Sequence, residues 1–245
     1  GDPLPPDPWS GPHLDAARVE DPRLFFDPTN IWLSHLHFTG EQWTRLGPRR
    51  IPPVPGFIRG DGKMILRNPV AKRNGVLGAL GYEFDWSAAD FEVGGVVFTN
   101  VGVRFKGNGT FIGALHRWKK PFKVDLDRHE KGRSLAGLTT LNFGNLSADM
   151  SCLSEALGYE CCRDAGLLAP RTAFARLFLT IDGRFERRPL GLYTMTENVD
   201  GVFARQRWGT RKMAIFKPVT YDLFGDWGDD WKAYEGDRKS TRLNS

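Results

Sequence analysis

Basic side chains flank a glycine-rich turn near the middle of the chain. The turn ends a segment, 101–105, in which apolar residues alternate with glycine and arginine. Glycine and asparagine accept positive φ angles, so such a turn lets the backbone approach a bound group closely. A second alternating segment, 122–126, carries another lysine. Paired strands would gather these cations around the turn, an arrangement suited to phosphate. The residues concerned are Arg104, Lys106, Gly107, Asn108, Gly109 and Lys123.

The alternation itself predicts two half-buried strands. Val101, Val103 and Phe105 would share one face of the first strand, and the apolar residues of 122–126 would share one face of the second. An ordinary hairpin with a solvated basic face explains the same residues, and short glycine motifs often match by chance. Spacing alone leaves both interpretations open.

Composition favours a globular protein with a sizeable core. The 245 residues are 40% hydrophobic and include 17 Phe and 8 Trp, which argues against global disorder. No window reaches the roughly 18 consecutive apolar residues of a membrane helix, so no membrane span is expected. The formal net charge of +5 falls to +3 without residues 237–245, whose three basic residues and one acidic residue contribute +2, and this is too small to argue for nucleic acid. A nucleic-acid contact through residues 117–120, Arg-Trp-Lys-Lys, is the weakest alternative.

The two ends of the chain differ in character from its centre. Residues 1–25 are rich in proline at their start and are expected to form an irregular linker. Residues 237–245, Asp-Arg-Lys-Ser-Thr-Arg-Leu-Asn-Ser, resemble the translation of a sequencing adapter and are excluded from fold reasoning. We therefore expect a domain over 26–236, with the natural sequence continuing beyond Gly236.

Strand patterns surround one main helix. Strands are expected at 31–38, 57–59, 64–66, 82–86, 91–93, 96–98, 101–105, 122–126, 174–181, 190–196 and 213–216. Helices are expected at 40–46, 150–165 and 203–208, the first of them capped by Thr39. This order is that of an α+β fold rather than of alternating βαβ units.

The main helix carries an apolar pattern and all three cysteines. Leu153, Leu157 and Cys161 recur every four residues, which predicts a buried stripe. Cys152 and Cys161 lie too far apart along a helix for a disulfide, so buried thiols are expected. His35 and His37 share a strand face, where a polar face is favoured over a metal site because no third ligand is in view.

Six blocks in this order resemble the CotH family, named for spore-coat protein H, whose members have an atypical protein-kinase-like fold. The blocks are 100–108, 119–125, 141–143, 163–172, 191–200 and 216–218. The resemblance implies a β-rich N-terminal lobe with one main helix and an incomplete C-terminal lobe. It also implies ATP and Mg²⁺ as cofactors of the intact protein.

The resemblance assigns roles to single residues. The turn Lys106 to Gly109 would approach ATP with its backbone, and Lys123 would pair with the nucleotide phosphates. Arg104 and Lys106 either share that work or are solvated. The carboxylate partner of Lys123 is Glu155 by motif position, whereas helical phase places Glu160 nearer the buried face. Further nucleotide contacts are assigned to Glu197, in the connection between the lobes, and to Lys217.

No catalytic or metal-binding residue is expected within this chain. The family's catalytic and metal-binding Asp and Asn would lie beyond Gly236, and the acidic residues near the end match no metal motif. These are Asp222, Asp226, Asp229 and Asp230. The implied function is ATP-dependent phosphoryl transfer to protein hydroxyls, with no turnover by this fragment. The alternative is a non-catalytic binding protein of a spore coat or cell surface, with coat or surface proteins as partners.

Overall fold

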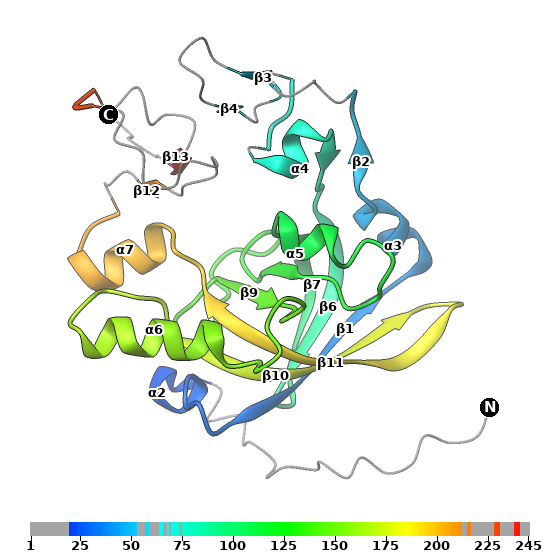
Figure 1. Cartoon of the computed structure of the whole chain (residues 1–245). Helices are drawn as coiled ribbons and strands as arrows, with labels where there is room; N and C mark the ends of the chain where they lie inside the picture. Colours follow the sequence, from blue (N-terminus) through cyan, green and yellow to red (C-terminus); the bar gives the residue numbers. More distant parts are fainter. Residues whose placement is uncertain are drawn as a thin grey trace.

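Seven strands close into a barrel that forms the centre of the molecule (Figure 1). The computed structural model describes residues 20–52, 57–58, 64–65, 68, 70–73, 75–211, 215–216, 228–230 and 238–240. Around the barrel the strands follow the order β1 (Ile31–Phe38), β10 (Thr172–Ile181), β11 (Phe185–Glu197), β9 (Thr140–Gly144), β8 (Phe122–Asp125), β7 (Val96–Phe105) and β6 (Ser87–Val93).

One parallel pair closes the barrel, and all its other neighbours are antiparallel. β1 runs parallel to β10, with Ile31 opposite Phe174, and antiparallel to β6. The β-rich architecture with few helices confirms the coarse prediction. The prediction of separate strands at 96–98 and 101–105 is wrong, since β7 is continuous over both segments.

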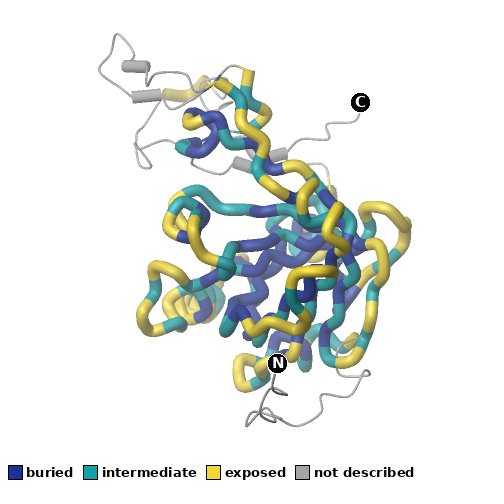
Figure 2. The backbone as a smooth tube through the Cα atoms, turned by 90° about the vertical axis from the view of Figure 1, so that its right-hand side faces the viewer, coloured by how far each residue is buried: buried dark blue, intermediate teal, exposed yellow. Residues whose placement is uncertain are grey.

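The interior of the barrel is apolar because alternate residues of each strand point inward. Val101, Val103 and Phe105 of β7 are buried, as the alternation predicts, and Phe122 and Val124 of β8 join them. Figure 2 shows these buried segments gathered in the strands of the barrel, with exposed residues in the surrounding turns. The opposite face of the same strands therefore carries the polar side chains.

Short elements surround the barrel. The described helices are α2 (Pro22–Phe25), α3 (Gly40–Leu46), α4 (Val76–Ala79), α5 (Gly109–Ile112), α6 (Ser154–Asp164) and α7 (Gly201–Trp208). Two-stranded sheets pair β2 (Arg49–Arg50) with β5 (Tyr82–Glu83), β3 (Phe57–Ile58) with β4 (Met64–Ile65), and β12 (Ile215–Phe216) with β13 (Arg238–Ser240). The predicted helix 40–46 is confirmed, and its Thr39 cap forms a capping box with Gln42.

The predicted buried stripe of the main helix is wrong. α6 begins at Ser154, and Leu153 and Leu157 are 46% and 56% exposed. The buried side carries Ala156, with Glu155 half-buried beside it. The cause lies in the partner surface, because α6 faces threonine hydroxyls of β11 rather than an apolar face. A polar surface on the barrel turns the polar side of the helix inward.

Gly158→Ala is expected to stabilise the protein by about 0.5–1 kcal/mol. Gly158 lies inside α6, where glycine costs conformational entropy relative to alanine. An added Cβ would meet no atom within 4 Å among the described residues. Urea denaturation of the two proteins measures the difference, and a loss of stability would contradict the position of this helix face.

The cysteines are less buried than predicted, whereas the histidines have the polar partners that the favoured prediction implies. The three cysteines are free thiols. The prediction that these thiols are buried is wrong, since Cys161 is exposed and the other two are only half-buried. Nε2 of His35 forms a hydrogen bond with Oγ1 of Thr180 over 2.8 Å, and Nε2 of His37 forms one with Oδ1 of Asp182 over 2.7 Å. Within the described ranges every helix is too short or too polar to span a membrane.

Candidate functional site

Strand register brings Arg104 and Lys123 together. Arg104 of β7 lies directly opposite Lys123 of β8, and Lys123 lies opposite Asn142 of β9. Asn142 in turn lies opposite Thr196 of β11. Directly paired residues share a sheet face, so these four side chains form one row across the outside of the barrel.

Lys123 is connected to the start of α7 through asparagine side chains. Its Nζ donates to Oδ1 of Asn198 over 2.9 Å, and Nδ2 of Asn142 donates to the same oxygen over 3.3 Å. Asn198 also donates to Asp200. Asp200 caps α7 by accepting from the backbone N–H of Val202 over 2.8 Å. The ammonium therefore lies among fixed polar groups at the point where β11 meets α7.

Of the two candidate carboxylates, Glu155 lies on the face that carries Lys123. Its Oε1 accepts from Thr196 Oγ1 over 2.9 Å, and its Oε2 accepts from Thr194 Oγ1 over 2.8 Å. Thr196 belongs to the row of Lys123. Glu160 is exposed and forms an ion pair with Arg163 within α6. The structure therefore places Glu155 on the barrel face that carries Lys123, where its hydrogen-bond partners are Thr194 and Thr196, and leaves Glu160 on the outer surface of the helix. The pairing of Lys123 with Glu155 stays a prediction.

The glycine turn is held in place by neighbouring groups. Gly107 has a φ of 81°, and an added Cβ would collide with Thr110 Oγ1. The Gly107 carbonyl accepts from the guanidinium of Arg73. Asn108 packs against Gly75, where a Cβ would lie 2.8 Å from its Nδ2. Glycine is thus required at 107 for its backbone and at 75 for space, while Gly109 begins α5.

The sequence did not indicate Arg73, which bonds to the turn, or Arg128, which lies farther along β7 over Gly102. Arg73 precedes α4, and Arg128 lies in the turn after β8. Each comes from an irregular segment without periodicity, so only tertiary contacts bring it to Arg104. The sequence signal that could have indicated Arg128 is Gly102, because a glycine within a strand suggests close approach of another group, and the Arg128 side chain passes over it.

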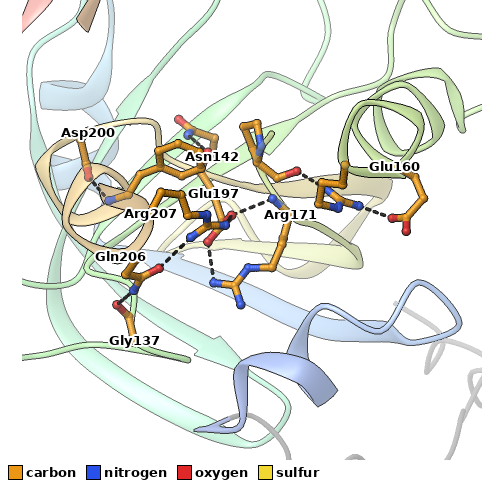
Figure 3. Close-up of polar contacts among 11 residues, drawn as sticks. Gly137, Asn142, Glu160, Arg171, Glu197, Asp200, Gln206 and Arg207 are labelled. Atoms are coloured by element: carbon orange, nitrogen blue, oxygen red, sulfur yellow. Dashed lines mark hydrogen bonds and ion pairs between the residues drawn. The ribbon is translucent and has the colours of Figure 1, made fainter. Parts of the chain in front are cut away.

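The remaining candidates differ in their surroundings. Glu197 has a fully buried side chain that is paired with Arg171 (2.6 Å) and Arg207 (2.7 Å), as Figure 3 shows. Both carboxylate oxygens are thereby engaged, and a nucleotide contact through Glu197 stays a prediction.

Lys106 is half-buried in the turn, where its backbone N–H donates to the carbonyl oxygen of Pro121 over 3.1 Å. Lys217 lies outside the described residues.

The described residues do not provide a magnesium site. Among them no group of three or more His, Cys, Asp or Glu side chains could hold a metal ion. Asp229 and Asp230 are exposed, while Asp222 and Asp226 lie outside the described ranges. We therefore assign no metal ligand in the described part of the chain and derive no step through Mg²⁺.

One comparison with known proteins identifies a family. The family model described as CotH kinase protein matches residues 103–244. The match includes the glycine turn, Lys123, Glu155 and Glu197, as well as the terminal residues that the sequence analysis set aside. A search of curated proteins finds no match to this chain.

Proposed function

Because the chain belongs to the CotH kinase protein family, we propose that it holds the nucleotide side of a kinase-like protein. In the proposed reaction the γ-phosphoryl group of ATP passes to a protein hydroxyl. The hydroxyl oxygen forms the new bond to the γ-phosphorus and releases its proton to solvent, the bond from that phosphorus to the β,γ-bridging oxygen breaks, and ADP leaves with the bridging oxygen. We assign binding of the nucleotide to this chain and assign no catalytic base within it.

The observation that carries this proposal is the shared face of Lys123 and Glu155 beside the glycine turn. In kinases a strand lysine neutralises nucleotide phosphates and a helix glutamate positions that lysine. Here Lys123 is on a barrel strand and Glu155 is on the helix over the same face. The row from Arg104 to Thr196 joins them, so one strand surface presents both the cation and its acidic neighbour.

The residues present fit the phosphates of a nucleotide. Within the part of the chain that the structure describes, the Nε atoms of Arg73 and Arg104 are buried without a hydrogen-bond partner, and Arg73 donates to the turn. Buried N–H groups are normally satisfied, so these donors favour an anionic ligand. Lys123 would offer a further positive charge, and Glu155 would hold the orientation of this face through its two threonines.

Lys123→Met is expected to weaken ATP binding at least about 10-fold, which is 1.4 kcal/mol. Methionine keeps the length of the side chain but removes the charge that faces the phosphates. Isothermal titration calorimetry with ATP measures the affinity of each protein.

Lys131→Met is the matched control. Lys131 is 79% exposed and pairs with Asp127 in the turn after β8. Its replacement should leave the affinity within about twofold, because an exposed ion pair contributes little. Absence of ATP binding by the unaltered chain, or equal losses in the two variants, would refute the proposed site.

A further inference from the structure

We propose that Arg73, Arg104 and Arg128, here called the arginine cluster, form a binding site for a polyphosphate chain. The inference deepens the proposed function, because it identifies the part of the nucleotide that the site recognises most strongly. It rests on that function for the identity of the natural ligand. The existence of an anion site rests on the cluster alone.

Two guanidinium groups of the cluster lie against one tryptophan. The Cζ of Arg104 is 4.8 Å from the ring centroid of Trp86, and the Cζ of Arg128 is 4.2 Å from it. Arg128 reaches this position by passing over Gly102, where a Cβ would collide with its side chain. Both cations are therefore held against the ring by packing, although the side chain of Arg128 is still 36% exposed, and this packing reduces the entropy lost on binding a ligand.

The third guanidinium links the cluster to the glycine turn. Arg73 donates to the carbonyl of Gly107, and its Cζ lies 4.3 Å from the ring centroid of Phe84. Its Nε and that of Arg104 are buried without a partner among the described residues, as is Oδ1 of Asn108 in the turn. Unsatisfied buried donors are costly in a protein alone. The two neighbouring cations also keep positive charge that an anionic ligand would compensate.

The two acidic groups nearby, Asp125 and Glu83, compensate only part of the charge of the three arginines. Asp125 lies 3.9 Å from Arg128, and Glu83 accepts from the backbone N–H of Lys72 over 2.6 Å. Burial and the charge of Arg104 lower the pKa of Arg73 to about 10. Burial and the charge of Arg128 lower the pKa of Arg104 as well. All three groups stay charged at neutral pH, so their mutual repulsion is relieved when an anion binds.

The spacing of the cations favours a ligand with several negative charges. The cluster extends from the turn, at Arg73, across β7 to Arg128, and Lys123 lies opposite Arg104 on the next strand. Arginine binds phosphate oxygens through paired N–H groups. A single phosphate could satisfy one or two of these side chains. A chain of three phosphates carries enough oxygens and charge for all of them.

Inorganic tripolyphosphate tests the site without the nucleoside. Calorimetric titration of the 245-residue chain should show binding, and Arg104→Gln and Arg128→Gln should each lower the affinity at least about 10-fold. Arg45→Gln is the control, since Arg45 is 65% exposed and pairs only with Glu41 among the described residues. It should change the affinity less than twofold, and orthophosphate should bind more weakly than tripolyphosphate to the unaltered chain.

A thermal melt without ligand separates loss of binding from loss of folding. Removing one of several repelling buried charges should leave the midpoint of Arg104→Gln unchanged or raise it. The inference is overturned if tripolyphosphate does not bind, if the two cluster variants bind it as Arg45→Gln does, or if orthophosphate binds equally well. A lowered midpoint with unchanged affinity would also overturn it, because the cluster would then be structural.

The outcomes also separate this inference from the proposed function. Binding of tripolyphosphate that depends on the cluster but is not displaced by ATP supports the site and refutes the nucleotide as its ligand. ATP binding that depends on Lys123 but not on Arg104 or Arg128 supports the function and refutes the cluster as the site that holds the nucleotide phosphates.

Discussion

Glu197→Ala is expected to destabilise the protein by about 3–5 kcal/mol, because it removes the acid from a buried ion network. The side chain of Glu197 is 0% exposed, while those of Arg171 and Arg207 are 26% and 16% exposed. Its Oε2 also accepts from the backbone N–H of Arg171 over 2.7 Å. Truncation would leave two partly buried guanidinium groups and one buried N–H without their acceptor.

The network matters beyond its pairs because it joins three elements. Arg171 directly precedes β10, Glu197 ends β11, and Arg207 lies in α7 (Figure 3). The arginines are also packed on rings, Arg171 on Phe26 at 4.6 Å and Arg207 on Phe203 at 4.5 Å. Loss of the carboxylate therefore loosens α7 from the barrel near Asn198, the partner of Lys123.

Urea denaturation measures the effect, with Glu41→Ala as the control. Glu41 is 82% exposed and pairs with Arg45 within α3, so its loss should cost no more than about 0.5 kcal/mol. Replacing Glu197, Arg171 and Arg207 together by leucine or methionine should restore part of the lost stability, because no charge is then left unpaired. Equal effects of Glu197→Ala and Glu41→Ala would show that the network contributes little.

Local patterns predicted several elements of the chain. Alternation predicted β1, and a capping threonine predicted α3 to the residue. The glycine turn and the flanking alternation predicted the pair β7 and β8, with Arg104 and Lys123 side by side. These features depend on residues that are close in sequence, so they can be predicted from the sequence alone.

Features that depend on distant segments were not predictable. Closure of the barrel needs β1 beside β10, where contacts such as that of His35 with Thr180 join residues 145 positions apart. The inward face of α6 depends on the polarity of β11, which the sequence of the helix does not contain. The arginine cluster has the same origin, since Arg73 and Arg128 meet Arg104 only through the fold.

Gly144→Ala is expected to cost about 2–4 kcal/mol, from overpacking and a lost hydrogen bond. Gly144 lies opposite Thr194 in the pair of β9 and β11. An added Cβ would lie 2.5 Å from Thr194 Oγ1 and 2.9 Å from Glu155 Oε2. Thr194 Oγ1 donates a hydrogen bond to Glu155 Oε2 over 2.8 Å, so the added methyl group would displace both side chains.

A double-mutant cycle with Thr194→Ala identifies the cause. Removing the hydroxyl makes room for the methyl group, so the double variant should be more stable than the sum of the single losses predicts, by about 1 kcal/mol or more. Additivity within about 0.5 kcal/mol would contradict the proposed collision. Gly158→Ala is the matched control, since the same substitution meets open space in α6.

The same variant links packing to the candidate site. Glu155 reaches the face of Lys123 only because Gly144 leaves space between β9 and α6. ATP affinity should therefore fall in Gly144→Ala and stay unchanged in Gly158→Ala, measured on folded protein at low temperature. If Gly144→Ala loses stability but keeps full ATP affinity, then Glu155 supports the fold alone and Lys123 acts without it.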